Sequence, residues 1–317
     1  NFFAKLGHEV IWISLAPTII KVPDNIEYYE FTNGIFSSIY NVRKIILKLN
    51  PDIVHIHYLG YYALLGLFSG AKCIVSTPWG SDINVGKKSF LKKTILSGIL
   101  KKSKLFTCDA YYMRDELKKF NIPHEKIHII NFGIDTKKFF KQERNFKVLK
   151  KFNISDELTI VSLRNFEIVY NIKTLINAAK IVLNEIPEIR FLLVGKGRLE
   201  NELKQMVHSL GINNSVHFTG FIDNHLLPSL ISSSDIYVST SLSDAGIASS
   251  TAEAMSCEIP VVISDSAEND KWIDNKVNGF LFSPKNSEQL AEILIKLIRD
   301  KPLREKVGKE GRNIIIK

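Results

Sequence analysis

Short apolar runs alternate along this chain with stretches whose apolar residues recur at helical spacing. In the first half, these runs are rich in β-branched residues and bounded by Gly, Pro or polar residues, which is typical of buried strands. The expected strands are residues 10–14, 52–57, 71–76, 104–108 and 127–130. The expected helices between them are residues 39–50, 61–69 and 112–120. This order predicts an α/β domain with a parallel, doubly wound sheet.

The second half repeats the pattern. Its expected strands are residues 158–163, 190–194, 216–219, 236–239 and 261–263. Its expected helices are residues 171–183, 199–210, 226–232 and 287–299. The basic, polar residues 137–151 are predicted to link the halves, which gives domains of residues 1–143 and 144–317.

The most informative stretch is residues 239–267, with the sequence STSLSDAGIASSTAEAMSCEIPVVISDSA. It predicts a small-residue loop, a helix, a stop at Pro260 and a buried strand. The loop and helix start contain Asp244, Gly246, Ser249, Ser250 and Thr251, of which the last three are helix-capping residue types. Free N–H groups at such a helix start form an anion site, above all for a phosphate. Glu253, in the first turn, is placed to accept hydrogen bonds from a sugar hydroxyl.

These residues resemble the donor-sugar motif of the retaining family-4 glycosyltransferases of the GT-B fold. That motif has an acidic residue, a glycine-containing loop, Glu-Ala-Met and Pro-Val-Val. The residues that match in order are Glu253, Ala254, Met255, Pro260, Val261 and Val262. Two positions depart from it: Asp244 lies one residue further from Glu253 than in the family, and Glu258 replaces a glycine.

The resemblance extends over nearly the whole chain and implies two Rossmann-like domains whose parallel sheets face a central cleft. The second domain would bind the donor and the first the acceptor. The opening residues have no initiating Met and are typical of a helix end. We therefore expect that the extreme N-terminus lies outside this sequence. From the resemblance we also expect that a last C-terminal helix lies outside it.

Arg164 follows the first strand of the second domain, where the family has an arginine that holds the donor diphosphate. The family's lysine nearby corresponds to Tyr170. A surface ion pair is the alternative role for Arg164. For Glu253 the alternative is a capping box with Ser250, since Ser-x-x-Glu satisfies that rule as well.

Gly195-Lys196-Gly197 follows a strand and precedes a helix, as does a glycine turn that approaches the nucleotide in the family. Alone this pattern is weak, and Lys196 could equally be a solvated loop residue. Phe221 lies in a segment that resembles the one contacting the base, although an ordinary strand end is the alternative. The predicted donor-binding residues are Arg164, Gly195, Lys196, Gly197, Phe221, Asp244, Gly246, Ser249, Ser250, Thr251 and Glu253.

On the acceptor side we predict Gly80, Ser81 and Asp82, which follow the third strand beside Trp79, where the family often has histidine. Asp82 is placed to orient or deprotonate the acceptor hydroxyl, and a helix N-cap is its alternative role. With Arg164 and Glu253 it completes the predicted catalytic set.

His57 lies at the end of the second strand and Tyr58 begins the loop after it, and both are expected to face the acceptor. His55 shares a strand face with His57, but without a cysteine or acidic cluster the two are poor metal ligands. No metal site is predicted.

The net charge of +9 lies in the first half. Residues 1–150 carry 23 Lys and Arg against 12 Asp and Glu, whereas the rest carries 19 against 21. This asymmetry indicates a polyanion or an anionic membrane as a partner. From Lys87 to Lys104 the lysines surround Leu91, Ile95 and Ile99, which predicts a basic amphipathic helix. We expect its apolar stripe to pack in the core while its lysines face lipid.

Hydrophobic residues make up 45% of the chain, but no apolar run is long enough to span a bilayer. The cysteines are few and lack metal spacing: Cys73, Cys108 and Cys257. We expect a reduced, cytoplasmic protein with peripheral contact to the inner face of the plasma membrane.

The sequence contains no Asp-x-Asp, the metal-binding motif of GT-A enzymes. We therefore expect no metal or other cofactor, with Arg164 and the helix start before Glu253 stabilising the leaving diphosphate. The resemblance implies a retaining transfer, by front-side attack, of a hexose from a nucleotide-diphosphate sugar to a lipid-linked or polysaccharide acceptor.

Four alternatives remain open. A sugar-nucleotide epimerase shares the GT-B fold, and a homologue without donor activity is compatible with Tyr170 and Trp79. A nicotinamide oxidoreductase would need Gly-x-Gly-x-x-Gly, but Glu200 stands at the third glycine position. A nucleic-acid-binding protein would explain the basic half, yet no binding motif accompanies the charge.

Overall fold

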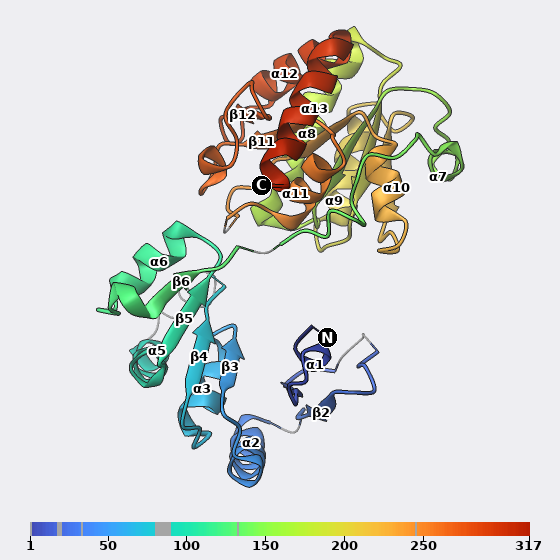
Figure 1. The fold of residues 1–317 in the computed structure, drawn as a ribbon. Coiled ribbons are helices and arrows are strands. Elements are labelled where there is room, and N and C mark those ends of the chain that lie inside the picture. Colours follow the sequence, from blue (N-terminus) through green and yellow to red (C-terminus); the bar gives the residue numbers. More distant parts are fainter. Residues whose placement is uncertain (1, 18–20, 33, 80–89, 132, 245) are drawn as a thin grey trace. The chain divides into compact units, whose positions relative to one another are not determined.

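The computed structural model describes residues 2–17, 21–32, 34–79, 90–131, 133–244 and 246–317. Its contacts divide the chain into two compact units, Asn1–Ile130 and Asn131–Lys317. Each unit combines helices with parallel strands (Figure 1), so the α/β prediction is confirmed. None of the helices in these ranges has the length and apolar character needed to cross a membrane.

The first unit alternates short strands and helices. Its strands are β1 (Ile11–Ser14), β2 (Glu27–Glu30), β3 (Val54–His57), β4 (Ile74–Thr77), β5 (Leu105–Cys108) and β6 (Ile127–Ile129). Its helices are α1 (Phe2–Lys5), α2 (Ile35–Leu49), α3 (Tyr61–Phe68), α5 (Phe90–Lys102), α6 (Tyr111–Lys118) and the 3-10 turn η1 (His124–Lys126). Strands β3 to β6 form one parallel sheet in chain order, and β1 pairs with β2 in a separate parallel sheet.

Two features of this unit differ from the sequence pattern. Strand β2 was not predicted, because its sequence EYYE has charged ends and no apolar run. Helix α2 begins at Ile35, earlier than predicted, directly after Gly34, whose φ of 88° ends the preceding segment.

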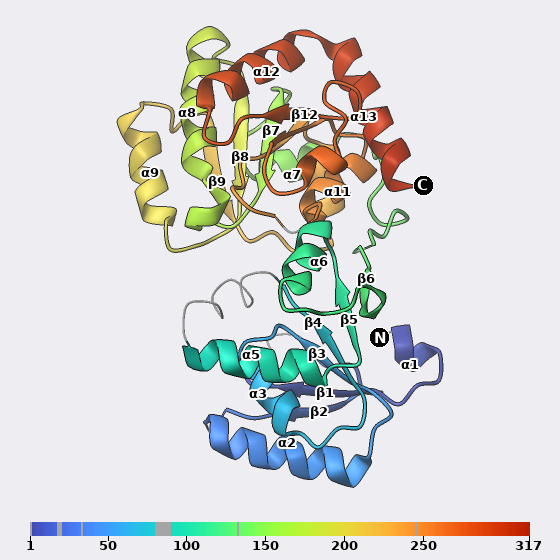
Figure 2. The same ribbon diagram turned by 90° about the vertical axis from the view of Figure 1, so that its left-hand side faces the viewer.

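Helix α3 lies very close to the sheet of the first unit. A Cβ atom added to Gly66 would lie 2.0 Å from Cδ1 of Ile56 on β3, so only glycine permits this approach. Leu65, also on α3, packs with Val42 and Ile46 of α2 in a small apolar cluster. Helix α2 is thus held against α3, at the periphery of the unit (Figure 2).

The second unit has one larger parallel sheet. Its strands are β7 (Thr159–Leu163), β8 (Arg190–Val194), β9 (Val216–Gly220), β10 (Ile236–Ser239), β11 (Val261–Ser264) and β12 (Phe280–Phe282). Its helices are α7 (Phe146–Lys150), α8 (Ile172–Glu185), α9 (Glu200–Ser209), α10 (Leu227–Ser232), α11 (Ser249–Ser256), α12 (Ser287–Arg299) and α13 (Lys301–Ile315), with 3-10 turns η2 (Ile168–Tyr170) and η3 (Asn269–Lys271). The strand order is β12-β11-β10-β7-β8-β9, so the direction of winding changes between β7 and β10.

Alternate residues of these strands enter two apolar cores, one on each face of the sheet. Ile160 and Phe191 belong to the core that includes α8 and α12. Their neighbours Val161 and Leu192 belong to the opposite core, which includes α11. The strands are therefore buried on both faces, which explains their nearly continuous apolar sequences.

The segment predicted as a linker, residues 137–151, is in fact part of the second unit. Phe139, Val148 and Leu149 are buried in its core beside α11. The prediction missed these three apolar residues because the rest of the segment is basic and polar. Contacts also assign residues 131–143 to this unit, so the structural division precedes the boundary drawn from the sequence.

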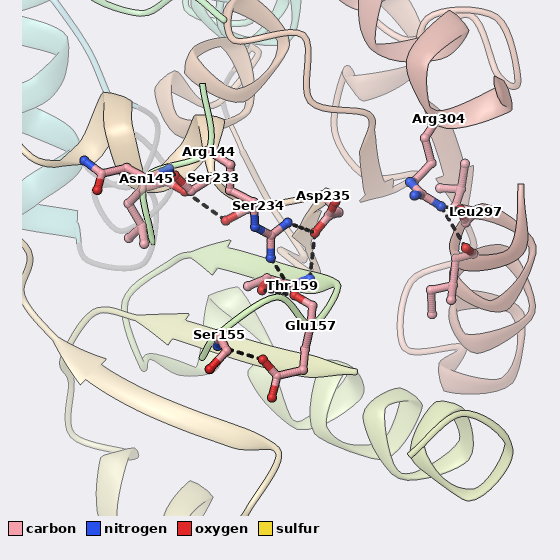
Figure 3. A network of polar contacts seen from close by, with 12 residues as sticks. Arg144, Asn145, Ser155, Glu157, Thr159, Ser233, Ser234, Asp235, Leu297 and Arg304 are labelled. Atoms are coloured by element: carbon pink, nitrogen blue, oxygen red, sulfur yellow. Dashed lines mark hydrogen bonds and ion pairs between the residues drawn. The ribbon is translucent and has the colours of Figure 1, made fainter. Parts of the chain in front are cut away.

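Polar contacts fix the start of α7 to the amino ends of β7 and β10 (Figure 3). Arg144 donates from Nη1 to Asp235 Oδ2 at 3.0 Å and from Nη2 to the carbonyl of Glu157 at 2.6 Å. The same Asp235 oxygen accepts from the backbone N–H of Thr159 at 2.8 Å. This network lies at the sheet edge opposite the strand ends that carry the predicted site, so its role is structural.

Helix α13 is the last element of the second unit, and the sequence pattern did not predict it. Its Arg304 is buried and donates to the carbonyls of Leu297 and Ile298 at 2.6 and 2.7 Å, which satisfies the end of α12 (Figure 3). Gly308, one helical turn later, brings α13 against the backbone after α11.

Replacing Gly308 by alanine should destabilise the second unit, although alanine normally favours a helix. The added Cβ would lie 2.1 Å from the carbonyl oxygen of Glu258, so α13 would have to move away. We expect the free energy of unfolding to fall by about 1–3 kcal/mol, measured by urea denaturation. Gly133→Ala is the control, because its Cβ would meet nothing within 4 Å. Equal effects of the two substitutions would contradict this account of the helix contact.

Candidate functional site

The carboxyl ends of β7 and β10 meet where the strand order of the second unit changes direction. Open α/β sheets bind ligands at such a point. Arg164 directly follows β7, and Asp244 lies in the loop after β10. The two chain segments therefore bring a predicted cation and a predicted acid to the same edge.

Arg164 and Asp244 form an ion pair in which the two side chains are only 10% and 11% exposed. The guanidinium carbon also lies 4.7 Å from the centre of the Tyr170 ring, a cation–π contact. Burial lowers the pKa of Arg164, but the neighbouring Tyr237 and Asp244 raise it by more, so the net direction is upward. Arg164 stays charged, and its buried Nε has no hydrogen-bond partner within the described ranges.

The loop after β10 is fixed to the segment that carries Tyr170. Thr240 donates from its hydroxyl to the carbonyl of Tyr170 at 2.9 Å. The backbone N–H of Leu242 donates to the carbonyl of Val169 at 2.7 Å. Gly246 is buried with φ of 66°, a conformation that favours glycine. The residues that lead to Asp244 are thus fixed to the segment that carries Tyr170.

Tyr237, which sequence reasoning missed, joins β10 to the start of α11. It is fully buried, and its hydroxyl lies 2.8 Å from Ser250 Oγ and 3.3 Å from Thr251 Oγ1. Burial raises the pKa of Tyr237, although Arg164 opposes that shift, so the phenol is neutral. A polar aromatic residue in an otherwise apolar strand was the available sequence signal.

The start of α11 differs from the predicted capping pattern. Its N-cap is Ala248, which makes no side-chain cap hydrogen bond. The backbone N–H groups of Thr251 and Ala252 both donate to the carbonyl of Ala248, at 2.9 and 3.0 Å. The residues before them, Ser249 and Ser250, occupy helix positions whose N–H groups have no intrahelical acceptor. These two are the amides suited to an anion, whereas Thr251 is buried and already bonded.

Glu253 stands half-buried on α11, and its carboxyl group makes no hydrogen bond or ion pair with the described part of the chain. The alternative capping box with Ser250 does not form, because the helix begins before Ser250 and that hydroxyl bonds Tyr237. Burial raises the pKa of Glu253 to about 7, with the charge of Lys138 opposing the shift. A carboxyl group without a partner remains available to a ligand hydroxyl.

Gly195 and Gly197 are required by the backbone of the neighbouring loop. A Cβ on Gly195 would lie 2.6 Å from the carbonyl oxygen of Arg164, and one on Gly197 would lie 2.4 Å from that of Phe166. The N–H of Phe166 donates to the carbonyl of Lys196 at 3.0 Å. The two glycines therefore hold the loop that positions Arg164, a role separate from any contact with a nucleotide.

Phe221 follows β9 and is 72% exposed. The Lys196 ammonium lies 5.8 Å from the centre of its ring. An exposed aromatic ring beside a cation is suited to stacking on a flat ligand such as a base. Lys196 is also exposed, so its position alone does not separate a ligand contact from a solvated loop lysine.

On the first unit, His55 and His57 lie side by side with ring centres 4.1 Å apart. Burial lowers the pKa of both, that of His55 to about 4 with a further contribution from His57. His55 Nε2 lies 2.7 Å from Thr77 Oγ1. Tyr58 has φ of 66°, an unusual conformation for a tyrosine. A neutral His57 at a strand end is able to accept a proton.

The predicted Gly80, Ser81 and Asp82 lie outside the described residues, so their roles stay predictions. The same holds for Lys87 and Lys88. Among the residues described, no three His, Cys, Asp or Glu side chains come together as metal ligands do. Of the three cysteines, Cys73 is partly exposed and Cys108 and Cys257 are buried.

Comparisons with known proteins agree with this arrangement. The family model of glycosyl transferases group 1 matches residues 143–314, and that of glycosyltransferase family 4 matches residues 1–138. The N-acetyl-alpha-D-glucosaminyl L-malate synthase of Bacillus anthracis is 26% identical over 98% of this chain and 85% of its own length. The alpha-monoglucosyldiacylglycerol synthase of Streptococcus pneumoniae is 25% identical over 83% of this chain and 63% of its own length.

The same fold occurs in solved structures. The Anabaena protein HepE in complex with UDP and glucose superposes with a TM-score of 0.78 at 19% identity, over 92% of this chain and 81% of its own. The prediction of the GT-B fold class is confirmed.

Glu253→Gln should make the stability of the protein less dependent on pH. Because the pKa of Glu253 is raised to about 7 from its ordinary 4.5, the native state binds this proton more tightly than the unfolded chain. Wild-type stability therefore falls as the pH rises from 4.5 to about 7. We expect the variant to gain stability over wild type through that window and to keep the advantage above it, measured by thermal unfolding. Glu258→Gln, which removes the acid of an ion pair with Lys141, controls for the loss of one negative charge. A constant difference across the window would contradict the assignment.

Proposed function

This chain belongs to the glycosyl transferases group 1 family and is a glycosyltransferase of the GT-B fold, and we propose that it transfers a hexose from a nucleotide-diphosphate sugar to a lipid-linked or polysaccharide acceptor. The proposal rests on the groups that meet at one sheet edge of the second unit. There the buried, charged Arg164 after β7 lies at the same edge as helix α11. Within the described residues, the amides of Ser249 and Ser250 and the carboxyl of Glu253 on that helix have no hydrogen-bond partner.

The diphosphate of the donor would bind Arg164 and the start of α11. A guanidinium has five N–H donors, and here Asp244 engages Nη2 while Nε has no partner among the described residues. The two free amides add the positive end of the helix dipole. Both groups are held by the fold, and Arg164 is also largely buried, so they would stabilise the charge that develops on the leaving diphosphate.

Glu253 would accept hydrogen bonds from the ribose hydroxyls, and Phe221 would contact the base. The hydroxyls favour the charged form of the carboxyl, so binding would lower the pKa of Glu253 from its raised value. The Anabaena structure in complex with UDP supports a uracil nucleotide as the first to test.

On the acceptor side, His57, Tyr58, Gly80, Ser81 and Asp82 would meet the hydroxyl that attacks the sugar. A lipid acceptor is supported by the name of the Streptococcus relative, a diacylglycerol glycoside synthase. The lysines from Lys87 to Lys104 would then face anionic lipid, and Lys101, Lys102 and Lys104 are exposed.

We assign a retaining reaction by front-side attack, with no covalent intermediate on the protein. Its chemistry requires only a stabilised leaving group and a positioned acceptor, and Arg164 with the α11 amides would supply the first. Because the sequence contains no Asp-x-Asp motif, we assign stabilisation of the charge on the leaving diphosphate to Arg164 and the α11 amides. Analysis of the product anomer by NMR tests retention, and an inverted anomer would refute it.

Calorimetric titration with UDP-, GDP- and ADP-sugars tests donor binding. We expect one nucleotide to bind, and Arg164→Lys to raise its Kd about 10-fold to 100-fold, because lysine cannot reproduce the forked donor set. Arg198→Lys is the matched control, since Arg198 lies on the same edge but is exposed and paired with Glu167. Equal affinities of the two variants would contradict the role given to Arg164.

Turnover tests Glu253 separately from folding. We expect Glu253→Ala to lower kcat/KM about 100-fold, because the ribose hydroxyls lose their acceptor, while Glu258→Ala leaves it near wild type. Unchanged turnover in Glu253→Ala would refute this site. Conversion of the donor without any acceptor, to an epimeric nucleotide sugar, would instead identify an epimerase.

Metal removal tests the remaining part of the proposal. We expect turnover to be unchanged after treatment with EDTA, because Arg164 and the α11 amides would supply the charge that a metal supplies elsewhere. Loss of activity with EDTA and its recovery with Mg²⁺ or Mn²⁺ would contradict metal independence.

A further inference from the structure

Helix α2 has two apolar faces, and only one of them is covered. Val42 and Ile46 pack in the first unit. On a different face, Phe36, Tyr40 and Leu47 are 86%, 69% and 57% exposed. Their spacing places them on one line along the helix. Large apolar side chains gathered in this way on a surface mark an interaction site.

The exposed apolar line is flanked by positive charge. Arg43 lies on one side of it, and Lys44 and Lys48 lie on the other, all with exposed side chains. The helix contains no acidic residue. Within residues 31–108 the sequence carries eleven Lys and Arg but only two acidic residues, Asp52 and Asp82. The partner of this face is therefore expected to be both apolar and anionic.

The face is held in place by α3. Arg43 Nη1 donates to the carbonyl of Phe68 at 3.0 Å, which satisfies the end of α3. Leu47 and Arg43 both border the turn at Gly70, where an added Cβ would lie 3.1 and 3.2 Å from them. Phe68, whose carbonyl accepts the bond from Arg43, is itself about half exposed. These contacts hold part of the surface in place before any partner binds, which lowers the entropic cost of binding.

Helix α5, where the sequence placed the membrane contact, lacks such an apolar face among its described side chains. Leu96, Ile99 and Leu100 are buried, and Lys101 and Lys102 are exposed. Lys102 donates to the carbonyl of Leu67 at 2.7 Å, beside the end of α3. Helix α5 can add charge next to α2, but it presents no described apolar side chain for insertion.

We propose that the outer face of α2 binds the surface of an anionic phospholipid bilayer. Phe36, Tyr40 and Leu47 would enter the boundary between head groups and acyl chains, with the helix lying in the membrane plane. Lys44 and Lys48 would contact lipid phosphates. Helices that combine aromatic insertion with flanking basic residues bind anionic membranes in this way.

This proposal rests on the surface of α2 and does not depend on the donor chemistry. Vesicle binding tests the α2 surface and nucleotide titration tests the donor site. A negative result in one experiment therefore leaves the other proposal unaffected. If both hold, the enzyme would meet a lipid-linked acceptor at the membrane surface.

The test is flotation of the purified chain with phosphatidylcholine vesicles that contain or lack phosphatidylglycerol. We expect binding to the anionic vesicles alone, weakened by salt. Phe36→Ser/Tyr40→Ser/Leu47→Ser should lower the bound fraction about tenfold. Val277→Ser, at an exposed apolar position of the second unit, is the control and should bind as wild type. Thermal unfolding and nucleotide titration establish that each variant is folded.

A second variant tests insertion directly. Phe36→Trp should shift its fluorescence to shorter wavelength with anionic vesicles and be quenched by brominated acyl chains. Unshifted emission, wild-type binding by the triple variant, or no binding of wild type to anionic vesicles would overturn the proposal. So would a dimer in sedimentation that the triple variant abolishes, since α2 would then be a protein interface.

Discussion

The buried guanidinium of Arg164 is the constraint around which the second unit is arranged. Removing a charge from water is costly unless partners replace the solvent. Asp244 and the Tyr170 ring supply those partners from two different segments. Their meeting at the end of β7 creates an edge where an anion finds a charge already desolvated and held in place.

Close contacts between backbones keep this edge rigid. Gly195 and Gly197 let one loop lie directly on the segment that follows Arg164. Tyr237 ties β10 to the first turn of α11 through two hydroxyl groups. At that turn the Ala248 carbonyl engages Thr251 and Ala252, so within the described residues the amides of Ser249 and Ser250 and the carboxyl of Glu253 have no partner. The site is thus assembled from neighbouring strand ends, with little contribution from flexible side chains.

Much of the fold could be predicted because the strands of the second unit are buried on both faces and most helices on one face, which gives the sequence a regular pattern of apolar residues. Strand β2 was not predicted because its sequence, EYYE, contains no apolar run. Residues 137–151 were mistaken for a linker because three buried apolar residues are hidden among basic ones. The ion pair between Arg164 and Asp244 could not be predicted from the sequence, for a different reason. The two residues are distant in sequence, and only strand order brings them together.

The sequence by itself determined the α/β class, the glycosyltransferase resemblance and the residue types of the donor edge, since each depends on local pattern and spacing. Tertiary structure alone decided which of those residues face a partner and which are free. It paired Asp244 with Arg164, engaged Thr251, left Glu253 half-buried without a partner in the described chain and raised its pKa. It also exposed the apolar line of α2 while burying Leu96, Ile99 and Leu100 of α5. Burial and desolvation depend on neighbours from elsewhere in the chain, so no local pattern could have specified them.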